Sequence, residues 1–249
     1  MRDKIYFLSV PFGYAVNFLV VFILLGYISP ENLGIYNLSQ LFISYCGLAH
    51  FGLLSGFARE LPATIASTKK NEAELLAGSV RRRIDVISIF LAGGVGVSAI
   101  YYYFIEFDPR IFATVCATCV VVYYNLKIQF LDTLYRGYQK FHRFGLLLFI
   151  QNILNFATLP LAMVWGFSGL LVKLVLNTFI SHFIRIKDWR DIVPSRHVEL
   201  EGLFRVGVPI FIGSVLFTVI FSIDRAIIAH FFGVEKLGQY AVAVQVSGF

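Results

Sequence analysis

Charged side chains inside long apolar segments are the residues of this chain with the most informative chemistry. Lys127, Lys173 and Arg225 each lie within such a segment, and Asp224 is an acidic neighbour. An ionisable group inside a membrane is costly, so it marks a binding or transport site by default. The planar guanidinium of Arg225 suits a diphosphate, and the balance of these charges is cationic. The pattern favours an anionic ligand.

Uncharged polar side chains accompany these charges at helical spacing, because positions i, i+4 and i+7 lie on one side of a helix. Four segments carry such a polar stripe: Thr114, Thr118, Asn125, Gln129 and Asp132; Gln151, Asn155 and Thr158; Lys173, Asn177 and Ser181; and Ser214, Thr218, Ser222 and Arg225. The same residue types hydrogen-bond between packed helices, and this alternative stays open beside a hydrated cavity.

The candidate substrate-binding residues lie on these stripes: Arg225, Lys173, Asn177, Asn155 and Gln129. For Arg225 and Lys173 the alternative is snorkelling, in which the charge reaches the nearer membrane surface. Lys127 lies about 200° around its helix from Asn125 and therefore off the stripe. We do not expect Lys127 to bind substrate.

Two further residues are candidates for coupling transport to H⁺ or Na⁺. Asp224 shares its helical face with apolar side chains, so a buried carboxylate there requires a partner on another helix. His50 is the strongly polar group near the middle of its apolar stretch. A histidine that only packs against neighbouring helices is the alternative for His50.

Two pairs of opposite charges lie near the ends of apolar segments. Arg59 and Glu60 are candidates for the cytoplasmic mouth of a cavity, with anchoring among lipid headgroups as the alternative. Asp132 and Arg136 are spaced i, i+4, which predicts an ion pair on one helix.

Motifs of enzymes and metal proteins do not account for this sequence. Cys116 and Cys119 are spaced as in some metal sites, but no second Cys/His pair completes such a site. The sequence has no Gly-rich phosphate loop, no HExxH sequence and no basic patch for nucleic acid. We expect no metal, no cofactor and no enzymatic activity.

The composition is that of a membrane protein. The chain of 249 residues is 58% hydrophobic and 14% charged, against roughly 25% charged residues in soluble domains. Residues 5–28, 33–57 and 144–165 contain no Asp, Glu, Lys or Arg. Each is longer than the roughly 20 residues that cross a bilayer as a helix. The first is too long for a signal-peptide core and is expected to be a retained helix.

The apolar segments predict an all-α fold, a polytopic bundle of transmembrane helices, because a spanning segment must satisfy its own backbone hydrogen bonds. They cover about 5–28, 33–57, 84–105, 111–134, 144–165, 167–184 and 207–232, and another begins near 237. The connections at 58–83, 135–143 and 185–206 are long and basic. Those near 29–32, 106–110, 166 and 233–236 are short.

The distribution of Lys and Arg predicts the orientation. The N-terminus and the long connections carry 16 of these residues, whereas the short connections carry only Arg110 and Lys236. Basic residues stay on the cytoplasmic side. We therefore expect a cytoplasmic N-terminus.

A repeated peptide predicts an internal duplication. Glu31-Asn-Leu-Gly-Ile-Tyr36 and Glu235-Lys-Leu-Gly-Gln-Tyr240 lie 204 positions apart and share Glu, Leu, Gly and Tyr. Chance similarity is the alternative. Six helices precede the second copy, so the repeats would run parallel. We expect 1–200 to form one complete six-helix lobe and 203–249 to begin a second, truncated lobe, as in a fragment.

Three stretches resemble the polysaccharide-biosynthesis flippases of the multidrug/oligosaccharidyl-lipid/polysaccharide (MOP) exporter superfamily. They are Leu33-Gly-Ile-Tyr36, Gly52-Leu-Leu-Ser-Gly-Phe-Ala-Arg-Glu-Leu-Pro62, and Gly207-Val-Pro-Ile through Ile223-Asp-Arg-Ala-Ile-Ile228 to Leu237-Gly-Gln-Tyr240. The resemblance implies a bacterial inner-membrane protein in contact with membrane lipids. It implies flipping of undecaprenyl-diphosphate-linked oligosaccharide for O-antigen (lipopolysaccharide), capsule or exopolysaccharide synthesis. The alternatives are a multidrug or cation exporter of the same superfamily and a membrane enzyme of surface-glycan assembly.

Overall fold

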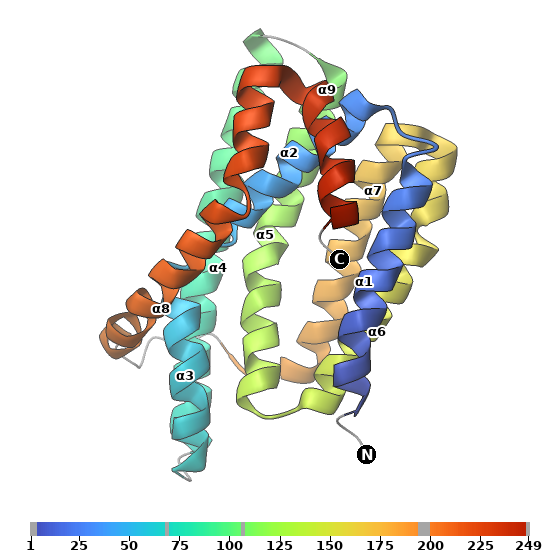
Figure 1. Cartoon of the computed structure of the whole chain (residues 1–249). Coiled ribbons are helices and arrows are strands. Elements are labelled where there is room, and N and C mark those ends of the chain that lie inside the picture. Colours follow the sequence, from blue (N-terminus) through green and yellow to red (C-terminus); the bar gives the residue numbers. More distant parts are fainter. Residues whose placement is uncertain (1–3, 68–69, 106–107, 194–199, 248–249) are drawn as a thin grey trace.

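The computed structural model describes residues 4–67, 70–105, 108–193 and 200–247, and every regular element in these ranges is a helix (Figure 1). The elements are α1 (Lys4–Leu24), α2 (Pro30–Cys46), α3 (Leu53–Ala66), α4 (Lys70–Ile105), α5 (Pro109–Gly137), α6 (Phe141–Ala157), α7 (Leu159–Ile186), the short 3₁₀ helix η1 (Lys187–Trp189), α8 (Glu201–Ile220) and α9 (Ile223–Ser247). The prediction of an all-α fold is confirmed.

Several helices are long and apolar enough to cross a membrane. Four such stretches are Asn71–Ile105, Pro109–Gly137, Leu159–Trp189 and Glu201–Tyr240, and Leu8–Leu24 is a shorter apolar helix. Together they form a multi-pass membrane bundle, as the composition predicts.

The short connections gather at one end of the bundle, at the top of Figure 1, which we call the short-turn end. It contains the turns at Ser29, Asp108, Gly166 and Gly233. Gly166 and Gly233 have φ values of 59° and 83°, and glycine adopts this left-handed region without a steric penalty. The chain therefore reverses at the positions that the sequence predicts.

Two helices of the short-turn end begin in the same way. Ser29 precedes Pro30, and its hydroxyl oxygen accepts a hydrogen bond from the Asn32 N–H at 3.4 Å. Asp108 precedes Pro109, and its carboxylate accepts from the Arg110 N–H at 2.8 Å. A polar cap followed by proline is a favourable helix start. Proline lacks a backbone N–H, but the N–H groups of the first turn have no partner within the helix.

The expectation that 33–57 forms one helix is wrong. α2 ends at Cys46 and α3 begins at Leu53, and the residues before α3 include two left-handed ones, Phe51 (φ 47°) and Gly52 (φ 88°). A Cβ atom on Gly52 would collide with the backbone of Gly207 in α8. The break thus brings two backbones into close contact, which periodicity within one segment does not reveal.

The polar connection predicted at 58–83 is largely helical. α3 continues to Ala66, and α4 begins at Lys70 and runs for 36 residues. Charge marks where a helix leaves the membrane, whereas the helix itself continues into water. Likewise, the segment 144–165 is interrupted at Thr158, two positions before Pro160, which has no N–H to continue the hydrogen bonds of α6.

The helices pack in pairs that position the polar groups. α1 packs on α6, α5 lies between α4 and α7, and α2 and α3 pack on α9 and α8. The largest apolar core lies at the opposite, basic end, where Leu53, Phe57, Leu126 and Leu134 are fully buried or nearly so. Of the basic residues that predict the orientation, Arg2, Lys69 and Arg196 lie outside the described residues.

Candidate functional site

A polar pocket of about 370 Å³ lies between α1, α2, α5, α6 and α7. Three of the predicted binding residues, Lys173, Asn155 and Asn177, line it. The other lining residues are Asn17, Tyr36, Gln40, Ile43, Val121, Asn125, Ile128, Gln151, Asn152, Leu174, Thr178 and Ser181. The polar stripes of α6 and α7 therefore face one another, as a hydrated cavity requires.

Lys173 supplies the positive charge of the polar pocket. Its residue is only 5% exposed, and its ammonium group donates to the side-chain oxygen of Asn155. Among the described residues that line the pocket, none is Asp or Glu. A buried charge needs compensation, and here the visible partner is a neutral amide. The described lining therefore contains one basic group and no acidic one.

The charged groups fix the orientation of the neighbouring amides, because Lys and Arg side chains only donate hydrogen bonds. Since Lys173 donates to the Asn155 oxygen, the Asn155 amide nitrogen must donate onward, and it does so to the oxygen of Asn17 at 2.7 Å. Arg185 donates to the oxygen of Gln151 at 2.8 Å. In Asn17 and Gln151 these bonds use the side-chain oxygen, so the NH₂ group of each amide takes no part in them.

Two further amides lie at the polar pocket. Asn177 lies 3.2 Å from the Thr158 hydroxyl, which donates to the Leu154 carbonyl oxygen at 2.7 Å. The Gln40 Nε2 atom is buried and has no hydrogen-bond partner within the described structure. Asn125 and Asn152 instead donate to backbone oxygens at 3.5 and 3.4 Å. The ammonium of Lys173 and the amides of these residues thus supply hydrogen-bond donors to the polar pocket.

Arg185 closes the polar pocket on the side of the basic end. Its residue is 2% exposed, its Nε donates to Asp132 at 2.6 Å, and its Nη1 donates to the Ser181 carbonyl oxygen at 3.2 Å. The structure thus pairs Asp132 with Arg185, and the predicted ion pair with Arg136 is wrong. Arg136 donates to the Asp132 backbone oxygen at 3.4 Å. Asp132 points across to α7, a contact that spacing along α5 does not reveal.

Sequence reasoning missed several residues of this site. Asn17 and Gln40 are isolated polar residues in apolar segments and form no stripe. Arg185 was counted with the basic connection, although it lies four positions after Ser181 and so extends the Lys173 stripe. Asp132, a carboxylate near the end of an apolar segment, was the signal for a cation such as Arg185.

Three of the predicted site residues lie elsewhere. Arg225 is half-buried on α9, outside the polar pocket, and its Nη2 donates to the Phe221 carbonyl oxygen at 2.9 Å. Asp224 accepts from the Tyr240 hydroxyl across the turn at Gly233. Gln129 lies on α5 beside Gly47 and does not line the pocket. The structure does not bring these residues together with Lys173.

The remaining candidates have local roles. His50 lies at the break between α2 and α3, where its Nδ1 accepts from the Gly52 N–H at 3.1 Å and its ring contacts Phe211 edge-on. Arg59 and Glu60 are exposed on α3. Lys127, which we did not expect to bind substrate, pairs with Asp85 at 3.0 Å.

The stripe predicted on residues 207–232 also lies outside the polar pocket. Ser214 and Thr218 are not buried and donate to carbonyl oxygens of their own helix. Ser222 is buried and lies 2.7 Å from the Tyr45 hydroxyl of α2. This stripe serves contact between helices at Ser222.

Comparison with known proteins places the fold. Residues 128–249 match the family model described as polysaccharide biosynthesis protein. No curated protein matches the chain significantly. Two solved transporters share its fold over 99% of its length: a MOP superfamily transporter from Pyrococcus furiosus (TM-score 0.67, 16% identity) and a multidrug resistance MATE family transporter of the MOP superfamily in an inward-facing conformation (TM-score 0.69, 15% identity).

The chain corresponds to 60% and 58% of the lengths of these two transporters. At this level of identity the likeness concerns the fold. The match of residues 128–249 to the family model is a similarity in sequence. Both agree with the resemblance that the sequence indicates: the chain is a multi-pass membrane protein with the fold of these two transporters, and its residues 128–249 resemble the polysaccharide-biosynthesis family.

Proposed function

We propose that this protein translocates undecaprenyl-diphosphate-linked oligosaccharide across the bacterial inner membrane, and that its polar pocket receives the diphosphate. The observation that carries the proposal is the buried ammonium of Lys173 among amides whose NH₂ groups remain for a ligand. A diphosphate offers many acceptor oxygens and negative charge. Hydrogen bonds in which one partner is ionised are about twice as strong as neutral ones.

A multidrug or cation exporter is the rival transporter. A site for organic cations requires carboxylates, and the described lining of the polar pocket contains none. The Pyrococcus furiosus transporter is described as having a binding pocket of reverse polarity that suggests a different function. In this chain the polarity of the pocket, with Lys173 and no carboxylate in its described lining, favours an anion.

The other candidates complete the proposal. Asp224 and His50 stay the candidates for coupling to H⁺ or Na⁺, and Arg225 stays a candidate for substrate contact outside the polar pocket. Arg59 and Glu60 are exposed where lipid headgroups or the entering substrate would meet α3. An enzyme of glycan assembly would need a cluster of catalytic groups at one face, and the described lining of the polar pocket offers amides, hydroxyl groups and one ammonium instead.

Surface glycan measures the proposed function. The natural gene is expressed in cells that lack the native flippase, at matched protein levels. Lys173→Gln should reduce surface glycan at least tenfold, because an amide replaces the buried charge, and a tenfold change corresponds to about 1.4 kcal/mol. Lys173→Arg should retain part of the export because the charge survives. Lys236→Gln, at an exposed position of α9, is the matched control.

Two results would reject this assignment. Export by Lys173→Gln at the wild-type level means that the polar pocket does not bind the substrate. A larger loss in Arg225→Gln than in Lys173→Gln moves the anion site to α9.

A further inference from the structure

The α2 wall of the polar pocket carries a hydrogen-bond donor that the protein does not use. Tyr36, Gln40 and Ile43 line the pocket at positions i, i+4 and i+7, so they lie on one face of α2. The Nε2 atom of Gln40 is buried and has no hydrogen-bond partner within the described structure. A buried donor without a partner carries a free-energy penalty, which a ligand oxygen at this position removes.

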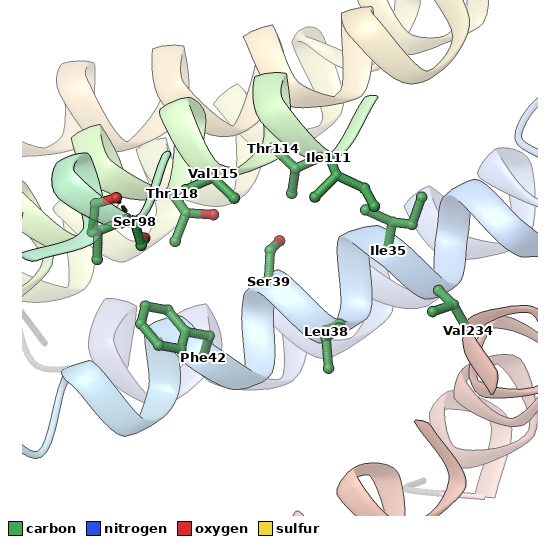
Figure 2. A pocket seen from close by; sticks show the side chains of 11 residues that line it. Ile35, Leu38, Ser39, Phe42, Ser98, Ile111, Thr114, Val115, Thr118 and Val234 are labelled. Carbon is green, nitrogen blue, oxygen red and sulfur yellow. Dashed lines mark hydrogen bonds between the residues drawn. The ribbon is translucent and has the colours of Figure 1, made fainter. Parts of the chain in front are cut away.

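The adjacent face of α2 shows the opposite situation. An apolar pocket of about 280 Å³ lies between α2, α4 and α5, and Figure 2 shows Ser39 pointing toward α5 there. The Ser39 hydroxyl donates to the Tyr36 carbonyl oxygen, and the Thr114 hydroxyl donates to the Arg110 carbonyl oxygen, each at 2.7 Å. These hydroxyl donors are satisfied within their own helices. Gln40, one position after Ser39, is not.

Gln40 and Lys173 are separate donors within the polar pocket. Gln40 comes from α2 and Lys173 from α7, and α5 packs on both of these helices. Within the described residues, no hydrogen bond joins Gln40 to Lys173 or to Asn155, the partner of Lys173. A ligand that binds both donors must therefore span the pocket from α7 to α2.

The two donors differ in what they offer to an anion. Lys173 supplies a positive charge, whereas the amide of Gln40 supplies N–H groups without charge. Hydrogen bonds with an ionised partner on each side are stronger than those from a neutral donor, so a single phosphoryl group is held mainly at Lys173. A second phosphoryl group, joined to the first, extends the ligand across the pocket.

The size of the polar pocket suits a head group. Its volume of about 370 Å³ is near the lower end of the range of roughly 300–1,000 Å³ for sites that bind small molecules. The pocket therefore accommodates two linked phosphoryl groups and not a whole lipid-linked glycan.

We propose that Gln40 makes the polar pocket selective for a diphosphate over a monophosphate. Lys173 binds one phosphoryl group, and the Gln40 amide donates to the other. This inference rests on the function proposed above and adds the residue that distinguishes two anionic head groups. The charge of Lys173 attracts both head groups, whereas only the longer one reaches a donor on a second helix.

The test removes the amide of Gln40 and keeps the shape of its side chain. Methionine is unbranched and of similar length, and it has no N–H donor. Gln40→Met is therefore the test variant. Gln239→Met is the matched control, because Gln239 is exposed on α9 and does not line the polar pocket. Lys173→Gln tests the proposed function in the same assay, with the full chain purified in detergent.

Two probes, geranyl diphosphate and geranyl monophosphate, share a short hydrocarbon chain and differ by one phosphoryl group. We expect Gln40→Met to weaken binding of the diphosphate about tenfold or more and to leave the affinity for the monophosphate unchanged. Lys173→Gln should weaken binding of both probes. Gln239→Met should change neither affinity.

The stability of the protein without ligand separates ligand contact from a structural role. Gln40→Met removes a buried donor that has no partner in the described structure, so the variant should unfold at the same denaturant concentration as the wild type or at a higher one. A clear loss of stability would mean that the amide supports the packing of α2, and it would overturn the inference.

The binding results can also overturn it. If Gln40→Met weakens both probes equally, or weakens neither, Gln40 does not recognise a second phosphoryl group. If inorganic diphosphate binds more tightly than geranyl diphosphate, the ligand is a free diphosphate and not a lipid carrier. If Lys173→Gln changes neither affinity, the proposed function fails. If Lys173→Gln weakens both while Gln40→Met keeps the wild-type preference for the diphosphate, only this inference fails.

Discussion

Gly34 of α2 and Gly238 of α9 pack reciprocally. A Cβ atom on Gly34 would overlap the carbonyl oxygen of Val234, and one on Gly238 would overlap the carbonyl oxygen of Pro30. Gly34 thus contacts the residue four positions before Gly238, and Gly238 contacts the residue four positions before Gly34. Gly34 and Gly238 lie 204 positions apart, at the same place in the two copies of the repeated peptide. A two-fold relation between the copies would produce this reciprocal contact.

Gly34→Ala should weaken the packing of α2 on α9. The added methyl group meets backbone atoms, which cannot rotate away, so we expect a loss of about 1–3 kcal/mol in the free energy of unfolding. Gly238→Ala should have a similar effect. Gly93→Ala in α4 is the control, because a Cβ atom there meets nothing within 4 Å.

Denaturant unfolding in detergent measures the difference. The Gly93→Ala variant should be at least as stable as the wild type, since alanine favours a helix over glycine by up to about 1 kcal/mol. Equal tolerance of alanine at Gly34 and Gly93 would show that α2 and α9 are not in backbone contact.

Arg185→Met should destabilise the protein much more than Arg136→Met. Removing Arg185 leaves the carboxylate of Asp132 without its partner at 2.6 Å, and breaking a buried pair costs about 3–5 kcal/mol. Arg136 makes only longer contacts, at 3.4 and 3.5 Å. The double variant Arg185→Met, Asp132→Leu should recover part of the loss, because no unpaired charge remains.

The midpoint of denaturant unfolding is again the measurement. If Arg136→Met loses more stability than Arg185→Met, Asp132 forms its ion pair with Arg136 along α5. If the double variant loses as much as the two single variants combined, Asp132 and Arg185 are not coupled.

The sequence was sufficient for features that depend on one segment at a time. The apolar segments at 84–105, 111–134, 167–184 and 207–232 lie within stretches long enough to cross a membrane. Gly166 and Gly233 reverse the chain where short connections were expected. Of the predicted polar stripes, Gln151 and Asn155 and the set Lys173, Asn177 and Ser181 line the polar pocket. Features that depend on contacts between distant segments were missed, such as the break at Gly52 against Gly207 and the Asp132–Arg185 pair.

Arg225 shows why a polar stripe alone is insufficient. Its helix carries Ser214, Thr218 and Ser222 at helical spacing, as a cavity wall would. Ser222 uses its position to contact Tyr45 of α2 at 2.7 Å, and Thr218 is not buried. Interhelical contact and cavity lining require the same residue types, so the neighbouring helix decides between them.

The orientation of the bundle can be measured by thiol labelling. In a version without Cys46, Cys116 and Cys119, single cysteines replace Ser67, at the basic end, or Lys236, at the short-turn end. The excess of basic residues predicts that a membrane-impermeant reagent on intact cells labels Lys236→Cys and not Ser67→Cys. The reverse pattern would place the N-terminus outside the cytoplasm.

The central claim is that Lys173 makes the polar pocket an anion site, and the affinity of the purified chain for geranyl diphosphate tests it most directly. The hydrocarbon chain of this probe is short, so its affinity mainly measures binding of the diphosphate. We predict measurable binding by the wild type, a loss of at least about tenfold in Lys173→Gln, and wild-type affinity in Lys236→Gln. Equal affinities of the wild type and Lys173→Gln would contradict the account.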